Sequence, residues 1–102
     1  MPIYMNISKS NAKNKKFTAV FFHYKDGKKV KIKTTQFGDS RYEDYTQHKD
    51  KERRKLYRGR HKKDLSKGTY MNAGYLSFYL LWGDSTSLQS NISNYKKMFK
   101  LK

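Results

Sequence analysis

The chain of 102 residues carries 24 Lys and Arg against 8 Asp and Glu, a formal net charge of +16. It contains no cysteine, which excludes disulfides, cysteine-ligated zinc and thiol catalysis. Hydrophobic residues make up only 35% of the chain but aromatic residues make up 16%, and such bulky rings can build a core from few positions.

The length predicts one domain over residues 1–102, with residues 1–15 and 100–102 as candidates for flexible ends. Residues 3–7 alternate between apolar and polar side chains, which favours a short strand. Residues 16–24, KFTAVFFHY, are rich in β-branched and aromatic types and predict a longer strand.

A hairpin should follow, because the Asp26-Gly27 pair is typical of a tight turn between strands. Residues 29–35 then alternate strictly, which predicts a half-buried antiparallel strand. We expect Val30 and Ile32 to face the core, and Lys29, Lys31 and Lys33 to form a basic outer face. Lysines in a strand can also serve simply to block pairing with another sheet edge.

The second half of the chain predicts helices. Residues 71–82, MNAGYLSFYLLW, are apolar on almost every side, so we expect a buried central helix with Trp82 in the core. Apolar residues in 86–99 recur at helical spacing and predict an amphipathic helix. With the basic helix described next, the fold class is α+β, a small antiparallel sheet followed by three α-helices.

The most unusual stretch is residues 36–63, which reads as a turn followed by a helix dense in Lys and Arg. Asp50 is a good N-cap, and Glu52 adds favourable negative charge to the first turn of a helix over 50–63. Gly59 is a poor helix former, which either a close backbone approach or simple tolerance would explain.

The cations of this helix fall largely on one side. Lys51, Lys55, Arg58 and Lys62 share a face, with Arg54 beside them. We expect Leu56, Tyr57 and His61 to form the opposite stripe, against the core. An ordinary solvated surface is the alternative interpretation of such a charge run, but the strongly basic chain favours a binding surface.

This stretch resembles a family of small basic uncharacterised proteins encoded by large DNA viruses of algae and amoebae. The likeness rests on FG at 37–38, YEDYTQHKD at 42–50 and RGRHKK at 58–63, and it extends to AG at 73–74 and LLW at 80–82. It covers roughly residues 7–99. Two positions depart from the family pattern, Gln36 in place of a common His and Leu65 where a Trp is common.

Catalytic chemistry is poorly supported by the sequence. His48 and His61 are 13 positions apart, and with Asp44, Asp50 and Glu52 they could form a nuclease-like metal site only as a minor alternative. Nucleophile–base pairs and glycine-rich phosphate loops are not evident. We expect no enzyme activity, no metal and no cofactor. Exposed tyrosines could stack on bases, although most rings are needed for the core.

The leading hypothesis is therefore a protein that binds nucleic acid, DNA rather than RNA, through phosphate contacts with little sequence preference. The candidate contacts are Lys29, Lys31, Lys33, Lys51, Arg54, Lys55, Arg58, Lys62 and Lys63. The resemblance implies a viral protein that helps to condense or organise a genome, in the virion or the viral factory. The alternative is a minor capsid protein that docks on acidic virion proteins or a membrane surface. We expect no transmembrane segment, because the longest apolar run is too short to span a bilayer.

Overall fold

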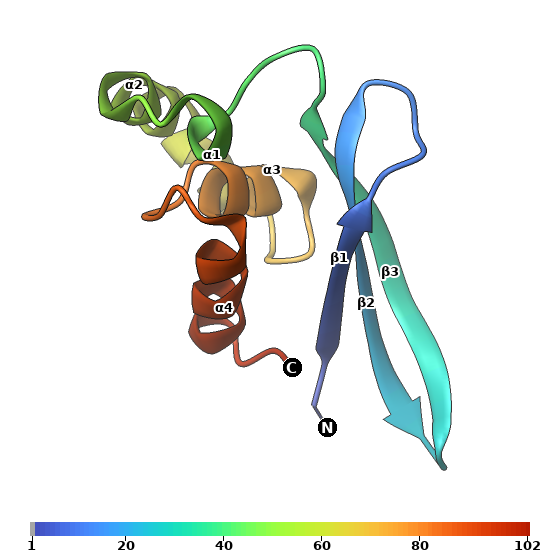
Figure 1. Cartoon of the computed structure of the whole chain (residues 1–102). Helices are drawn as coiled ribbons and strands as arrows, with labels where there is room; N and C mark the ends of the chain where they lie inside the picture. The colour runs from blue at the N-terminus through green and yellow to red at the C-terminus, as the bar shows by residue number, and fades with distance from the viewer. Residues whose placement is uncertain (1) are drawn as a thin grey trace.

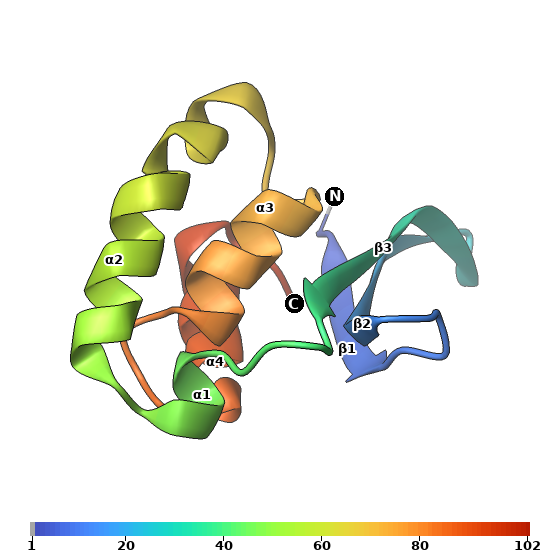
Figure 2. The ribbon, with the colours of Figure 1, turned by 90° about the horizontal axis from the view of Figure 1, so that it is seen from above.

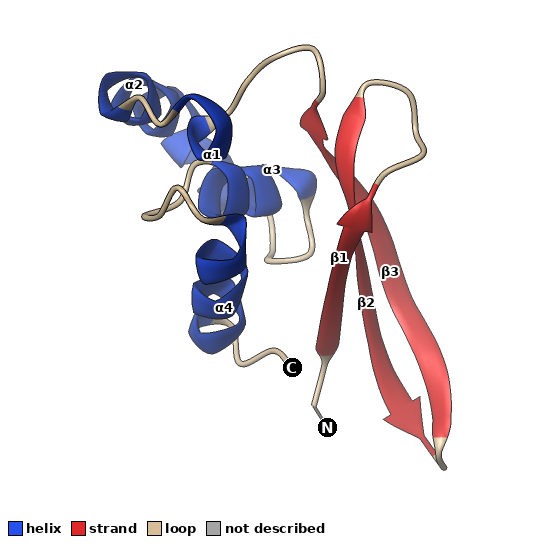
Figure 3. Ribbon diagram, viewed as in Figure 1, coloured by secondary structure: helices blue, strands red, loops and turns tan. Residues whose placement is uncertain are grey.

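The structure, a computed structural model, describes residues 2–102. A three-stranded antiparallel sheet forms one layer, and the helices form a second layer on one face of it (Figures 1 and 3). The predicted α+β class is confirmed, with four α-helices in place of the expected three. No helix within residues 2–102 is both long and apolar enough to cross a membrane.

The sheet has the strand order β1-β2-β3, with β1 at Tyr4–Lys9, β2 at Lys15–Lys25 and β3 at Lys28–Asp39. The predicted turn between β2 and β3 is confirmed, since Asp26 and Gly27 have φ values of 53° and 76°. Positive φ at both central residues suits the right-handed twist of a two-residue hairpin. Gly38 also has a positive φ, 81°, and a Cβ there would lie 2.8 Å from Leu81 Cδ1.

An irregularity in the β2–β3 pairing divides the hairpin lysines between the two faces. Phe21 pairs with Lys33 and Phe22 with Lys31, so Ile32 is an extra residue on β3. Cross-strand partners point to the same face. Lys33 therefore lies on the helix-covered face with Phe21, and Lys31 lies on the open face with Phe22. The prediction that Lys29, Lys31 and Lys33 share one face is wrong, because a bulge reverses the alternation.

The far end of the hairpin extends past the helical layer (Figure 1). Residues 24–34 are all exposed, including Val30 at 38% and Ile32 at 42%. The prediction that Val30 and Ile32 face the core is therefore wrong. An alternating strand buries its apolar side chains only where another layer covers it, and no helix within residues 2–102 covers this part of the hairpin.

The helical layer begins with α1, Tyr45–His48, and α2, Lys51–His61, which continues into a 3₁₀ helix at Lys62–Lys67. The predicted helix over 71–82 is shorter than expected and changes type. It runs as α3 over Ala73–Leu76 and then as a π-helix, η2, over Ser77–Leu81. The last helix, α4, spans Leu88–Met98. Figure 2 shows α3 between α2 and the sheet.

The core lies between the sheet and η2. Its buried members are Met5, Ala19, Phe21, Phe37, Leu76, Leu80, Leu81, Tyr95 and Leu101. Asn91 of α4 is also buried, and its amide donates to Leu80 O at 2.9 Å and Ser85 O at 2.8 Å. The two ends of the chain meet where Ile3 bridges Leu101. Trp82, which the sequence predicts to be buried, is half-buried and packs against the edge of this core.

Candidate nucleic-acid interface and adjoining cleft

Two acidic caps place α2 at the edge of the helical layer. Asp44 accepts hydrogen bonds from Thr46 N at 2.9 Å and from Lys16 Nζ of β2 at 2.6 Å, which ties α1 to the sheet. Asp50 accepts from the backbone N–H groups of Glu52 and Arg53, at 3.0 and 3.2 Å. The predicted N-cap at Asp50 is confirmed, and both helix starts are fixed by side chains close in sequence.

The inner side of α2 is fastened by two arginines. Arg58 Nη1 donates to Trp82 O at 2.8 Å, and its guanidinium lies 4.1 Å from the centre of the Phe78 ring. Arg54 Nε donates to Gly83 O at 2.6 Å, and its Nη2 pairs with Asp84 at 2.7 Å. Burial lowers the pKa of Arg58, and the neighbouring Arg54 charge lowers it further.

Trp82 O is available because Trp82 is the C-cap of a helix, and Gly83 O follows directly after it. The last C=O groups of any helix have no partner within it and carry partial negative charge. Here the helix is η2, and cations from α2 serve as its C-terminal cap. The same interaction explains why a helix that has no buried residue of its own holds its position.

An aromatic ladder continues this contact. Tyr57 stacks on Trp82 with ring centres 4.2 Å apart and on His61 with centres 4.2 Å apart, while the His48 ring lies tilted against Trp82 at 5.2 Å. Burial raises the pKa of Tyr57 to about 12. The ladder covers part of Trp82 and leaves the rest facing a cleft, which accounts for its half-buried state.

The inner stripe of α2 is therefore Arg54, Tyr57, Arg58 and His61. The predicted stripe was wrong at Leu56, which is 55% exposed. Arg54 and Arg58 turn inward because they bind carbonyl groups of a distant segment, and the sequence pattern does not reveal those partners. Four of the predicted nucleic-acid contacts remain exposed on the outside of α2 and its 3₁₀ extension, and we call them the basic face: Lys51, Lys55, Lys62 and Lys63.

The hairpin lysines do not join the basic face. In both Figure 1 and Figure 2, α2 and the hairpin tip lie at opposite sides of the molecule. Lys29 and Lys31 are exposed on the open sheet face, with Lys29 Nζ 4.1 Å from the Phe22 ring centre. Lys33 donates instead to Asn72 Oδ1 at 3.2 Å. The predicted contacts thus form two separate surfaces, with Lys33, Arg54 and Arg58 in neither.

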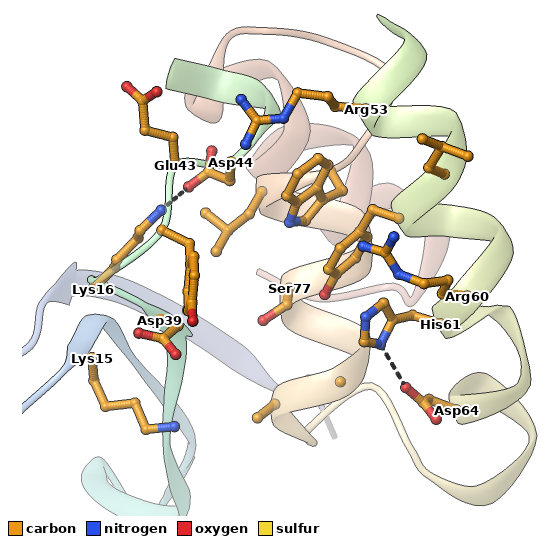
Figure 4. A pocket seen from close by; sticks show the side chains of 18 residues that line it. Lys15, Lys16, Asp39, Glu43, Asp44, Arg53, Arg60, His61, Asp64 and Ser77 are labelled. Carbon is orange, nitrogen blue, oxygen red and sulfur yellow. Dashed lines mark hydrogen bonds and ion pairs between the residues drawn. The ribbon is translucent and has the colours of Figure 1, made fainter. Parts of the chain in front are cut away.

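A cleft of about 780 Å³ lies between α2, α3 and the near end of the sheet. Figure 4 shows it lined by side chains from all three, with Ser77 directed inward from the floor. Two other arginines of α2, Arg53 and Arg60, extend into it from one wall. Lys15 and Lys16 stand on the opposite wall.

The acids of the cleft are mostly engaged. Asp44 pairs with Lys16 at 2.6 Å, and Asp64 is hydrogen-bonded to His61 at 3.0 Å. Asp39 pairs with Arg41 at 2.9 Å, and the hydrogen bonds from Arg41 lower the Asp39 pKa to about 2. None of the ion pairs among residues 2–102 involves Arg53 or Arg60. The cleft therefore presents free guanidinium groups.

His48 has a structural role at the start of α2. His48 Nδ1 accepts from the Asp50 N–H at 2.9 Å, and its Nε2 is buried without a hydrogen-bond partner among the described residues. In the described part of the chain, no three His, Asp or Glu side chains are grouped so as to hold a metal ion.

The cleft was not predicted from the sequence. It is assembled from the sheet, α2 and α3, which are distant in the chain, and Arg53 and Arg60 differ from their neighbours only in the direction they face. The sequence did offer one signal that these two arginines act together. They are seven residues apart, and this separation puts two side chains on the same side of a helix.

Comparison with known proteins adds one relationship. A protein-family model for a family of unknown function, DUF5754, matches residues 5–61. This match covers more than half of the chain and includes the sheet from Met5 onward, α1 and all of α2. No curated protein and no solved structure matches the chain. The chain belongs to the DUF5754 family.

Proposed function

We propose that this protein binds nucleic acid, DNA rather than RNA, by contacts from the basic face to backbone phosphates. The observation that carries the proposal is that the cations of α2 have two different roles. Two arginines anchor the helix, and Lys51, Lys55, Lys62 and Lys63 are left exposed on its outer side. Cations held on a rigid element lose less freedom when they meet a phosphate than cations on a flexible tail.

The net charge of +16 supports the same proposal. A field of this size attracts polyanions from a distance and works without sequence preference. The hairpin lysines Lys29 and Lys31 form a second, smaller patch on the far side of the molecule. Two separated patches would let one molecule touch two segments of a nucleic acid, which suits condensation.

The resemblance to small basic viral proteins supports a narrower version of the proposal. In this version the protein helps to condense or organise a viral genome, within the virion or the viral factory. Condensing a genome requires no reading of base edges, so phosphate contact is enough for such a role.

A titration with labelled duplex DNA, single-stranded DNA, duplex RNA and poly-glutamate, each at two salt concentrations, tests the proposal. We expect duplex DNA to bind most tightly and to lose affinity steeply as salt rises. Poly-glutamate represents an acidic protein surface. If it binds as tightly as DNA, the proposal fails and docking on acidic virion proteins becomes the better account.

A further inference from the structure

We infer that the cleft between α2 and the sheet is a binding site for a nucleotide, through its phosphate and its planar base. This site goes beyond the proposed phosphate contacts of the basic face and does not depend on them. It uses different residues of α2, and it lies on the side of the helix that faces the sheet (Figure 4).

The size of the cleft fits a ligand of this kind. Ligand sites in proteins commonly have volumes of about 300–1,000 Å³, and the cleft has about 780 Å³. Its floor is formed in part by the small residues Ala73, Gly74 and Ser77. Small floor residues leave depth for a ligand between the two walls.

The charge of the cleft selects for an anion. Arg53 and Arg60 lie on the same wall and have no ion-pair partner among residues 2–102, and Lys15 faces them. Of the lining acids, only Glu43 has no cationic or histidine partner in the described chain. Guanidinium groups present paired donors that match phosphate oxygens, so either arginine can bind a phosphate group of the ligand.

The remaining lining favours a planar ring. His61 is held on Tyr57 and by Asp64, yet 41% of its side chain stays exposed at the cleft. Tyr42 and Leu56, which are 69% and 55% exposed, also line the cleft and lack an intramolecular cover. A base could extend the existing aromatic ladder at His61, because stacking on aromatic side chains tolerates any base.

Trp82 provides a reporter, because it is the single tryptophan and it lines the cleft. The test follows the Trp82 fluorescence and the NMR shift of its indole N–H during titration with adenosine 5′-monophosphate. We expect a saturable change in both signals. Adenosine and inorganic phosphate, each carrying half of the recognised groups, should bind more weakly than the nucleotide.

The decisive variant is Arg53→Gln/Arg60→Gln, with Lys55→Gln/Lys62→Gln as the matched control. Each removes two charges from the same helix, and Gln is a good helix former. We expect the first to weaken nucleotide binding by about tenfold or more, because charge-assisted hydrogen bonds to phosphate are lost. We expect the control to bind the nucleotide as the unaltered protein does.

Two results would overturn the inference: no saturable change in either signal up to about 10 mM nucleotide, or equal weakening of nucleotide binding in the two double variants.

A competition experiment identifies the source of the nucleotide. If a short single strand with a terminal phosphate displaces the nucleotide, and a strand without that phosphate does not, the ligand of the cleft is the end of a nucleic-acid strand. If neither strand displaces the nucleotide, the ligand of the cleft is a free nucleotide. Loss of duplex binding in Lys55→Gln/Lys62→Gln tests only the basic face, and loss of nucleotide binding in Arg53→Gln/Arg60→Gln tests only the cleft. Each proposal can therefore fail without the other.

Discussion

Replacing Arg58 by Met should remove the main anchor of α2. Met keeps most of the aliphatic stem but has no donor for Trp82 O, which Arg58 contacts at 2.8 Å, and no charge to place over Phe78. A hydrogen bond from a charged group contributes about 1.5–3 kcal/mol. A cation–π contact contributes about 0.5–2 kcal/mol. New packing of Met against Phe78 offsets part of this loss.

We therefore expect Arg58→Met to lower the free energy of unfolding by about 2–3 kcal/mol, a large share of a typical 5–15 kcal/mol. The melting temperature should fall by about 10–20 °C for a domain of this size. Lys55→Met is the control, because it removes the same charge from the exposed side of the helix and should change stability by less than about 0.5 kcal/mol.

The assay is urea unfolding followed by circular dichroism, with Trp82 fluorescence as the second probe. Loss of one positive charge relieves the same long-range repulsion in both variants, so the difference between them isolates the anchor. If Arg58→Met and Lys55→Met unfold at the same urea concentration, the contacts to η2 do not hold α2 and the reasoning is refuted.

Other variants test the packing. Gly83→Ala should prevent folding or lower the free energy of unfolding by more than about 3 kcal/mol, because its Cβ would lie 2.1 Å from Tyr79 O. In contrast, a Cβ at Gly59 would have no described atom within 4 Å, so Gly59→Ala should stabilise the protein by about 1 kcal/mol in thermal melts. Asn91→Ala removes the three hydrogen bonds of a buried side chain and should cost about 2–4 kcal/mol in urea unfolding. A cost under about 1 kcal/mol would contradict their role. Tyr57, with a folded pKa of about 12 against 10.0 when free, contributes stability that is complete below pH 10 and lost between pH 10 and 12. Tyr57→Phe should lose less stability over this range than the unaltered protein, and an identical alkaline titration would count against the buried phenol.

Features fixed by neighbouring residues could be predicted from the sequence. The hairpin turn at Asp26-Gly27 depends on which residues accept positive φ, and the start of α2 depends on one carboxylate at Asp50. The amphipathic spacing that gave the last helix is similarly local. These predictions needed no knowledge of what packs against each element.

Features that depend on distant partners could not be predicted. The bulge at Ile32 reverses the facing of the lysines, and nothing in the alternating sequence marks it. Arg54 and Arg58 look like their exposed neighbours until η2 presents its carbonyl groups. The cleft escaped prediction for the same reason, since its walls come from three separate parts of the chain.

Two lysines of the basic face give the most direct test of the proposed function, through the salt dependence of duplex binding. If Lys51, Lys55, Lys62 and Lys63 each neutralise one phosphate, the slope of log K against log salt from this face should be about −3.6, at ~0.9 per contact. Lys55→Gln/Lys62→Gln should weaken binding to all duplex sequences alike and flatten the slope by about 1.8. A folded double variant that binds duplex DNA with unchanged affinity and slope would contradict the proposal that this face contacts nucleic acid.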